Sequence, residues 1–460
     1  MAPQIENQHP LGLINKQVDY KNLLTELMNM AKKQGVTQTE ASISHDTGFS
    51  VTVRNQEVET IEHNRNKSLG INVYFGRKKG SASTSDFSSQ AIKSTFEAAC
   101  HIARFTTEDP FNGLAESQFL EKTPSDLDLC HPWSIDPQNA IALGKECEAN
   151  ALAIDNRLTF SEGVSLATQE AIYVYANSNG FLAGYPSSLH NISCNLIAKD
   201  KMGMQRDGSF TINRNPNQLQ SIEKLAKEAA DNTVKRLSAR RISTCQVPVI
   251  YHSEIAPGLI RTFLEAISGG TLYRNASFLV DHIGKSVFGK RISIYEKPHL
   301  LSALGSAPFD DEGVRTSDRV LIDEGILCGY LLNSYSARKL GLQTTGNAGG
   351  FHNILLKTSQ FKLNDLVKQM EKGLLVTEVM GQGINLVTGD YSRGAAGFWV
   401  ENGEILFPVE EITIAGNLKD MYQNIVAIGN DINHKSTIQT GSILLENMMI
   451  AGTQKYQKEK

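Results

Sequence analysis

The spacing of histidine and glutamate is the first feature to examine for catalytic chemistry in this 460-residue chain. Metal peptidases commonly hold zinc with two histidines on one helical face, and a glutamate between them handles the proton of the bound water. No two of the eleven histidines lie within one helical turn of each other. The sequence therefore predicts no local zinc motif. The histidines are His9, His45, His63, His101, His131, His190, His252, His282, His299, His352 and His434.

The tripeptide His252-Ser253-Glu254 comes closest to a metal-binding pattern. No second histidine lies nearby, and a serine or glutamate at this place suits the start of the helix expected just after it. We therefore favour a side-chain helix cap. One alternative stays open. Distant histidines could converge on one zinc ion, for example His252, His282 and His352.

Three acidic residues and an arginine surround a glycine turn at 310–315. Such a group could bind a cation or pair with the terminus of a peptide. A solvated turn before a strand at 320–323 is the simpler interpretation. We retain Asp310, Glu312 and Arg315 as candidate peptide contacts.

The stretch 380–397 is rich in glycine, which allows another backbone to approach closely. Tight hairpin turns explain most of these glycines. Glycine-flanked strands with exposed edges also suit an extended peptide that binds as an added strand. Tyr391, Ser392 and Arg393 would offer polar contacts there and form the second candidate set.

Other common motifs of catalysis are not matched. The segment 76–80 lacks the Lys-Ser/Thr ending of a phosphate-binding loop, and 381–383 lacks the third glycine of a dinucleotide signature. There is no Gly-x-Ser-x-Gly, and the six cysteines include no Cys-x-x-Cys pair. We therefore assign no catalytic residue, and we expect neither nucleotide binding nor a disulfide framework.

Charge and hydropathy narrow the functional classes further. The net charge of -4 offers no broad attraction for nucleic acid or anionic lipid. Residues 1–17 lack the basic start and apolar core of a secretory signal, and no apolar run approaches the roughly 20 residues of a membrane-spanning helix. We expect a cytoplasmic protein that binds neither nucleic acid nor membrane.

The elements that would position these residues follow from periodicity. Apolar residues recur at helical spacing over 20–34, 88–105, 139–152 and 219–237. Runs of β-formers predict an antiparallel meander of short strands at 40–44, 49–54, 58–63 and 69–75, and a second strand set over 157–212 with a hairpin turn at 177–180. The segment 106–137 is expected to be a loop.

A basic stretch at 235–244 is our candidate linker. Beyond it we expect a strand at 247–251, a helix at 255–267, and then short strands interrupted only by a helix at 363–373. The prediction is an α+β protein of two domains. These are an N-terminal domain of mixed antiparallel sheet and helices (20–238) and a mostly β C-terminal domain (246–453), flanked by a polar tail (1–19) and a frayed tail (454–460).

Several sequence blocks resemble the TldD/PmbA family of metallopeptidases, in particular its PmbA (TldE) half, over nearly the whole chain after residue 20. The blocks are 79–83, 306–310 with 312–316, 334–342, 388–403 and 411–418. In this family the TldD half holds its metal with a His-Glu-x-x-x-His helix and a late cysteine. The resemblance places the two histidine positions near Thr262 and Ile267 and the glutamate position near Phe263, and no cysteine follows Cys328.

The resemblance therefore implies no metal or other cofactor in this chain, with zinc in a TldD-type partner. It implies a hetero-oligomeric peptidase that encloses a cavity for unfolded or unstructured peptides. A homodimer is expected in isolation, because a surface that buries a homologous partner tends to self-associate. We favour a non-catalytic peptidase subunit. A zinc metallopeptidase active on its own and a regulatory binding protein that modulates DNA gyrase are the alternatives.

Overall fold

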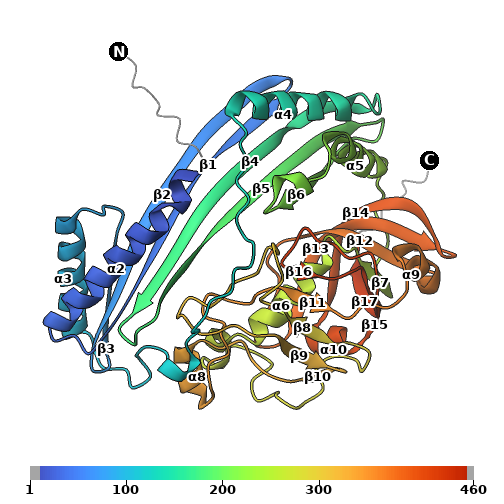
Figure 1. Ribbon diagram of the computed structural model, residues 1–460. Coiled ribbons are helices and arrows are strands. Elements are labelled where there is room, and N and C mark those ends of the chain that lie inside the picture. Colours follow the sequence, from blue (N-terminus) through green and yellow to red (C-terminus); the bar gives the residue numbers. More distant parts are fainter. Residues whose placement is uncertain (1–10, 453–460) are drawn as a thin grey trace.

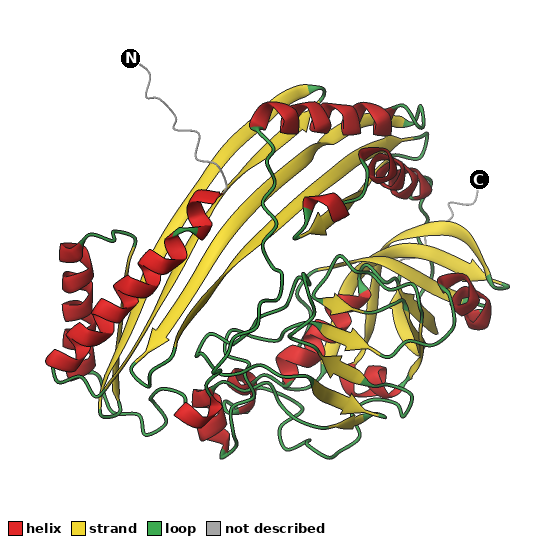
Figure 2. Cartoon of the chain, viewed as in Figure 1, coloured by secondary structure: helices red, strands yellow, loops and turns green. Residues whose placement is uncertain are grey.

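The computed structural model describes residues 11–452 and shows a mixed α+β fold with three sheets, as Figures 1 and 2 illustrate. Most strand pairs are antiparallel. The expected α+β class is therefore confirmed, while the expected domain boundaries stay predictions. Within the described residues, no helix is both long and apolar enough to cross a membrane.

A long six-stranded antiparallel sheet dominates the N-terminal half of the chain (Figure 1). Its strand order is β3-β2-β1-β4-β5-β6, which consists of two meanders joined where β1 pairs with β4. The hairpin turn expected at 177–180 connects β4 to β5 and is confirmed. The strands are β1 (Gln38–Arg54), β2 (Glu57–Phe75), β3 (Lys78–Thr84), β4 (Leu158–Asn177), β5 (Leu182–Lys199) and β6 (Met204–Asn213).

The prediction of four short strands before residue 76 is wrong, because they form two long strands, β1 and β2. Gly48 lies between two of the expected strands but is inside β1, where a Cβ atom would come within 2.1 Å of the Thr168 carbonyl oxygen. The polar residues 64–68, between two other expected strands, lie in a solvent-exposed part of β2. Gly48 thus marks a place where two strands approach closely, and the polar residues mark a strand segment exposed to solvent. The chain reverses direction at neither place.

Helices cover one face of the long sheet in two separate groups (Figure 2). One apolar cluster joins Ile43 of β1 to Leu24 and Phe96, and the other joins Val51 of the same strand to Cys147 and Leu225. Three of the helices begin at the side-chain caps Ser88, Asp136 and Ser221. The helices are α1 (Leu11–Ile14), α2 (Lys16–Lys33), α3 (Ser89–Phe105), α4 (Pro137–Leu152) and α5 (Ile222–Lys235), and a 3-10 turn, η2 (Pro216–Gln218), precedes α5.

The start of the first helix differs from the expectation. Residues 11–19 of the expected polar tail are largely helical, because they belong to α1 and the start of α2, whose Leu13 and Tyr20 side chains are buried. Residues 1–10 and the expected frayed tail at 454–460 lie outside the described residues. The expected loop is confirmed as a segment with a single 3-10 turn, η1 (Ser117–Phe119), and residues 106–136 are called the crossing segment below.

The opposite face of the long sheet contacts the C-terminal half through an aromatic cluster. Tyr175 and Phe181 of the sheet region pack with Phe309 and Val314. The ring centroids of Phe181 and Phe309 lie 5.0 Å apart in an edge-to-face arrangement. This cluster joins the two halves of the chain.

Two further sheets form the C-terminal half. In the order β14-β13-β12-β7-β17-β15, β14 also pairs with β17, so that five of these strands close into a ring. The other sheet has the order β10-β9-β8-β11-β16. The strands are β7 (Cys245–Tyr251), β8 (Ile294–Glu296), β9 (Arg319–Asp323), β10 (Ile326–Leu327), β11 (Ile354–Leu356), β12 (Gly373–Met380), β13 (Asp390–Glu401), β14 (Glu404–Asn417), β15 (Ile425–Ile428), β16 (Ile438–Gln439) and β17 (Ile443–Ala451).

The expectation of one helical interruption after residue 267 is wrong. The expected helices are present as α6 (Ala256–Ala266) and α9 (Leu363–Met370), but α7 (Gly269–Leu272), α8 (Ser334–Leu340) and α10 (Leu418–Gln423) also form. These three are too short to show a helical repeat of apolar residues. The boundaries of α8 come instead from a capping box between Asn333 and Ser336 and from Gly341 in the left-handed region, at φ 67°.

Candidate functional site

The three positions at which the resemblance places the two histidines and the glutamate of the TldD motif lie on α6 and at its end, inside an apolar core. Thr262, Phe263 and Ile267 are buried, with exposed fractions of 4% or less. The Thr262 hydroxyl donates a hydrogen bond to the Gly258 carbonyl oxygen at 3.1 Å, within the same helix. These side chains make internal contacts and offer no nitrogen or carboxylate to a metal.

An aromatic cluster fills the space around Phe263. The ring centroid of Phe263 lies 4.9 Å from that of Phe288 and 6.1 Å from that of Tyr422, and the last two rings stack at 4.6 Å. The Tyr422 hydroxyl donates to the Leu259 carbonyl oxygen, and burial raises its pKa well above the ordinary value. The residues present do not fit a zinc ion at this place.

The histidines of the alternative zinc site have separate local contacts. His282 Nδ1 lies 2.7 Å from the Val280 carbonyl oxygen, and His352 Nε2 lies 3.0 Å from the Gly346 carbonyl oxygen. Within residues 11–452, no group of three or more His, Cys, Asp or Glu side chains is arranged to hold a metal ion.

The expected side-chain cap at His252-Ser253-Glu254 does not form. The His252 carbonyl oxygen accepts instead from the main-chain N–H groups of Ile255 and Ala256, both at 2.9 Å. The backbone rather than the Ser253 or Glu254 side chain therefore begins α6.

Asp310 is a buried turn residue, with an exposed fraction of 2%. One carboxylate oxygen accepts from the main-chain N–H groups of Glu312 and Val314, both at 2.9 Å, and the other accepts from that of Ala348 at 3.0 Å. Burial raises the pKa of Asp310 to about 8, the Glu312 carboxylate adds to the rise, and the three donors oppose it. These contacts give Asp310 a structural role in this turn.

Glu312 and Arg315 lie on the two sides of the same turn. Glu312 is half-buried and accepts from the main-chain N–H of Ser334, at the start of α8, at 2.9 Å. The Arg315 side chain is exposed beside the crossing segment, where its main-chain N–H donates to the Phe119 carbonyl oxygen. Of this candidate set, Arg315 is the residue most open to a peptide.

The second candidate set alternates along β13, as side chains on a strand do. Tyr391 is buried in the C-terminal core with an exposed fraction of 4%, whereas Ser392 is exposed. Arg393 is half-buried and donates from Nε to the Met380 carbonyl oxygen at 3.1 Å. The structure therefore does not bring all three side chains to one surface.

Because the strands close into a ring, less of the edge of β14 is left without a strand partner than the sequence suggested. One edge of β14 is occupied at 413–415 by β17, and Arg240 pairs with Val409 just before that. The N–H of Arg240 donates to the Pro408 carbonyl oxygen, and the Arg240 carbonyl oxygen accepts from Glu410. The segment 404–407 of β14 pairs with β13 on one edge and with no other strand on the opposite edge within the described residues.

A cavity of about 460 Å³ lies beside this free segment. Leu375, Phe398 and Phe407 give it an apolar wall, and Ile405 and Leu406 at its rim are about half exposed. His252 and Glu254 lie on the same cavity and bring polar groups to it. An apolar cavity next to a free strand edge can accept the side chains of an extended peptide.

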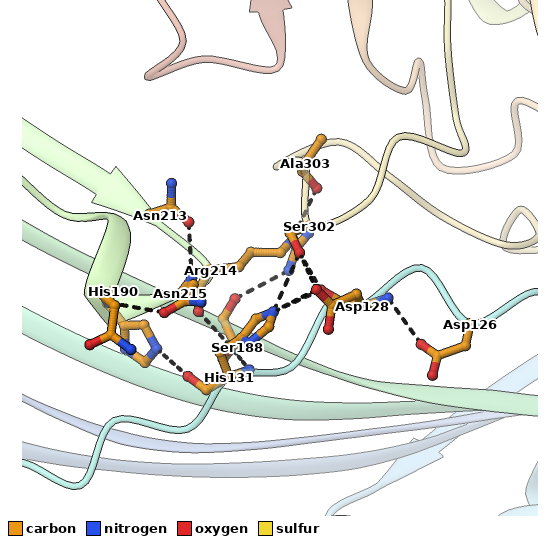
Figure 3. Close-up of polar contacts among 11 residues, drawn as sticks. Asp126, Asp128, His131, Ser188, His190, Asn213, Arg214, Asn215, Ser302 and Ala303 are labelled. Atoms are coloured by element: carbon orange, nitrogen blue, oxygen red, sulfur yellow. Dashed lines mark hydrogen bonds and ion pairs between the residues drawn. The ribbon is translucent and has the colours of Figure 1, made fainter.

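A polar junction that sequence reasoning missed joins the crossing segment, the long sheet and the loop 298–306 (Figure 3). Arg214 donates to the carbonyl oxygens of Ala303, Leu304 and Ser188 at 3.0, 2.8 and 3.2 Å. The Ser188 hydroxyl donates to the Arg214 carbonyl oxygen and accepts from the His131 N–H. No local motif marks these residues, because their partners are distant in the chain.

The same junction brings a serine, a histidine and an aspartate together without the geometry of a catalytic triad (Figure 3). The Ser302 hydroxyl donates to an Asp128 carboxylate oxygen at 2.7 Å. His131 Nε2 lies 3.3 Å from the Ser302 hydroxyl and 3.2 Å from the Asp128 carboxylate. In a triad the carboxylate and the hydroxyl contact different ring nitrogens, so this group acts as a connection between loops.

Family models match three consecutive parts of the chain. Residues 39–103 match domain 1 of the PmbA/TldA metallopeptidases, residues 130–237 match the central domain, and residues 244–452 match the C-terminal domain.

Two relatives align along nearly the full length. The metalloprotease PmbA of Escherichia coli O157:H7 is 49% identical over 413 residues, which are 90% of this chain and 92% of the relative. The metalloprotease PmbA homolog of Haemophilus influenzae is 48% identical over 92% of this chain and 94% of its own.

Solved structures share the fold. A proposed modulator of DNA gyrase from Bacteroides thetaiotaomicron superposes with a TM-score of 0.89 at 25% identity, covering 95% of this chain and 99% of that one. TldE from Thermococcus kodakarensis superposes with a TM-score of 0.79 at 20% identity, covering 94% of this chain and all of the other, and this likeness concerns the fold alone.

Proposed function

This chain belongs to the PmbA/TldD family of metallopeptidases, and from that premise we propose that it is a peptidase subunit that holds no zinc itself. In this proposal it assembles in the cytoplasm with a TldD-type subunit, which carries the metal. Its own part is to shape the cavity that receives unfolded or unstructured peptides. Alone, it forms a homodimer.

The packing of Phe263 is the observation that carries the proposal. The position expected for the catalytic glutamate holds a fully buried phenylalanine, enclosed by Phe288 and Tyr422. A zinc site there would need polar ligands and a bound water in place of this aromatic packing. The core around α6 is therefore suited to stability rather than to hydrolysis.

The apolar cavity beside 404–407 supports the role in peptide binding. Unstructured peptides expose apolar side chains to water. Transfer of such a side chain into a cavity lined by Leu375, Phe398 and Phe407 lowers the free energy of the complex. The free main-chain groups of 404–407 are available to the same peptide as a strand partner. Contacts from Arg315, Ser392 and Arg393 remain part of this proposal.

Metal content and activity together test the proposal. The purified chain is analysed for metals and assayed on an unstructured peptide, alone and after mixing with a TldD-type subunit. We expect no stoichiometric metal, no cleavage by the chain alone, and chelator-sensitive cleavage by the mixture. A TldD-type subunit whose metal-site glutamate is replaced by glutamine provides the control, and its mixture should be inactive.

Stoichiometric zinc in the chain, with chelator-sensitive cleavage in the absence of a partner, would overturn the proposal in favour of an independent zinc peptidase. A third outcome corresponds to the gyrase modulator named for the related solved structures. It would require that the partner-free chain bind DNA gyrase and alter its activity without cleaving it.

A further inference from the structure

A second cavity, of about 250 Å³, lies on the helix-covered face of the long sheet. It opens between the two apolar clusters, and Leu13 of α1, Lys16 at the start of α2 and residues 47–49 of β1 line it. The crossing segment forms one wall with residues 133–135. This cavity is separate from the peptide surface proposed above, and the inference does not rest on that proposal.

Strand register explains why this part of the sheet is polar. On β1, residues 45, 47 and 49 continue the face that holds Ile43 and Val51, the apolar contacts on either side. Thr47 pairs with Arg65 of β2 on one side and with Glu170 of β4 on the other. A cation, a hydroxyl and a carboxylate thus lie in one row across three strands.

His45 is the most deeply buried polar group of the cavity, with an exposed fraction of 1%. Its Nδ1 lies 2.6 Å from the Tyr20 hydroxyl, and its Nε2 is buried with no hydrogen-bond partner within the described residues. Burial lowers the pKa of His45 to about 4, and Lys16 and Arg65 add to the decrease. The ring is therefore neutral at pH 7.

The Tyr20 contact selects the tautomer of this neutral ring. If the hydroxyl donates to Nδ1, the proton of the ring is on Nε2, and one buried group lacks a partner. If Nδ1 donates instead, both Nε2 and the Tyr20 hydroxyl proton lack partners, which costs more free energy. His45 therefore presents an Nε2–H donor that requires an acceptor.

Glu170 presents the complementary requirement. Its Oε2 atom is buried with no hydrogen-bond partner within the described residues, and burial raises its pKa to about 7. A cationic N–H donor at this atom would restore the ionised form and satisfy the oxygen. Lys16 and Arg65, on the same cavity, supply positive charge near the His45 donor.

We propose that this cavity binds a small zwitterion, a free amino acid or a dipeptide. The ligand carboxylate accepts from His45 Nε2–H and faces Lys16 and Arg65, and the ligand ammonium donates to Glu170. The volume limits the ligand to this size class, because cavities for larger organic ligands usually exceed about 300 Å³. Trp133 and Phe49 give the remaining wall an apolar surface for a side chain.

Isothermal titration at pH 7 tests the proposal with the full chain, the protein amino acids and glycylglycine as probes. At least one probe should bind with one-to-one stoichiometry. Its N-acetyl derivative, which lacks the ammonium, and its amide, which lacks the carboxylate, should each bind at least about tenfold more weakly. Failure of every probe, or equal affinity for the blocked derivatives, would overturn the proposal.

Substitutions locate the site. Glu170→Gln keeps the shape of the side chain and should weaken the zwitterion at least about tenfold, while affinity for the N-acetyl derivative stays unchanged. Glu162→Gln, an exposed change of the same charge on the same strand, should leave both affinities unchanged. Wild-type binding by Glu170→Gln would contradict the assignment.

Nuclear magnetic resonance gives a measurement that does not depend on a variant. In wild-type protein labelled with ¹⁵N-histidine, the bound probe should shift the Nε2 resonance of His45 and leave that of His101, on α3, in place. A His45 signal unchanged at saturating probe would place the ligand elsewhere and overturn the site.

Discussion

The Tyr20 hydroxyl of α2 lies 2.6 Å from Nδ1 of His45 on β1. This one hydrogen bond joins α2 to the long sheet beside the 250 Å³ cavity. This contact holds a neutral imidazole in a place where burial and three nearby cations, Lys16, Arg65 and Lys67, oppose protonation. The pH dependence of stability therefore depends on His45.

Stability should decrease in acid because of His45. Its pKa is about 4 in the folded state and about 6.5 when unfolded, so the unfolded state binds more protons between these values and stability is lost as the pH falls from 6.5 to 4. The contribution is on the order of 3 kcal/mol. Urea unfolding of wild type and His45→Gln at a series of pH values measures it. An identical pH profile for the two proteins would contradict the prediction.

Glu170 should act in the opposite direction. Burial raises its pKa from 4.5 to about 7, so the folded state binds more protons in this window, and stability is lost as the pH rises through it. Glu170→Gln stays neutral, so its stability relative to wild type should increase as the pH rises from 4.5 to 7, whereas the His45 contribution is the same in both proteins. Thermal melts at both pH values measure the difference. The exposed change Glu162→Gln serves as the control and should follow wild type.

Removal of the Asp310 carboxylate should destabilise the fold. Asp310→Ala leaves three main-chain N–H groups without their acceptor and should cost about 3 kcal/mol. Asp310→Asn keeps one carbonyl oxygen and should cost less. Asp318→Ala, which removes an exposed ion pair with Lys297, should cost less than about 1 kcal/mol. Denaturant unfolding ranks the three, and an Asp310→Ala protein as stable as Asp318→Ala would show that these hydrogen bonds contribute little.

Arg214 should be required for the polar junction. Arg214→Ala removes three donors to carbonyl oxygens and should lower the free energy of unfolding by about 3 kcal/mol. Hydrogen exchange should accelerate first in the segment 298–306, which the arginine connects to Ser188 of β5. Arg206→Ala, an exposed arginine whose ion pair with Glu162 spans 3.7 Å, is the control. Uniform acceleration across the sheet would indicate global destabilisation instead.

Leu406 tests the apolar cavity of the proposed peptide surface. Leu406→Asp places a charge at the rim of this cavity and should raise the KM of the mixture with a TldD-type subunit about tenfold, because an apolar peptide side chain is then placed against a carboxylate. Leu301→Asp changes another exposed leucine, which does not line this cavity, and should leave the KM unchanged. Equal KM values for the two variants would exclude this cavity from substrate binding.

Much of the helical structure could be predicted from local sequence. The helix expected at 88–105 is α3, and its start at Ser88 follows from a side chain that satisfies the first free N–H groups. The helix expected at 219–237 is α5, capped in the same way by Ser221. Such signals lie within a few residues of the element that they define, so tertiary contacts are not needed to see them.

The candidate site was less accessible to sequence reasoning. Asp310 was chosen for its charge, yet its carboxylate is directed to main-chain donors, one of them at Ala348. Arg214, Ser188 and Ser302 were not chosen, because their partners lie up to about 170 residues away in the chain. Charge and residue type do not reveal which groups will be buried together.

The sequence by itself determined the α+β class and most of the helices, and it shows that Thr262, Phe263 and Ile267 are not zinc-binding residue types. Only the tertiary structure decided that β1 and β2 are continuous, that β14 and β17 close the ring, and that His45 and Glu170 share a cavity. The physical reason is the range of the interactions. Capping and helical periodicity act over a few residues, whereas strand register, burial and the pairing of buried polar groups depend on segments brought together from distant parts of the chain.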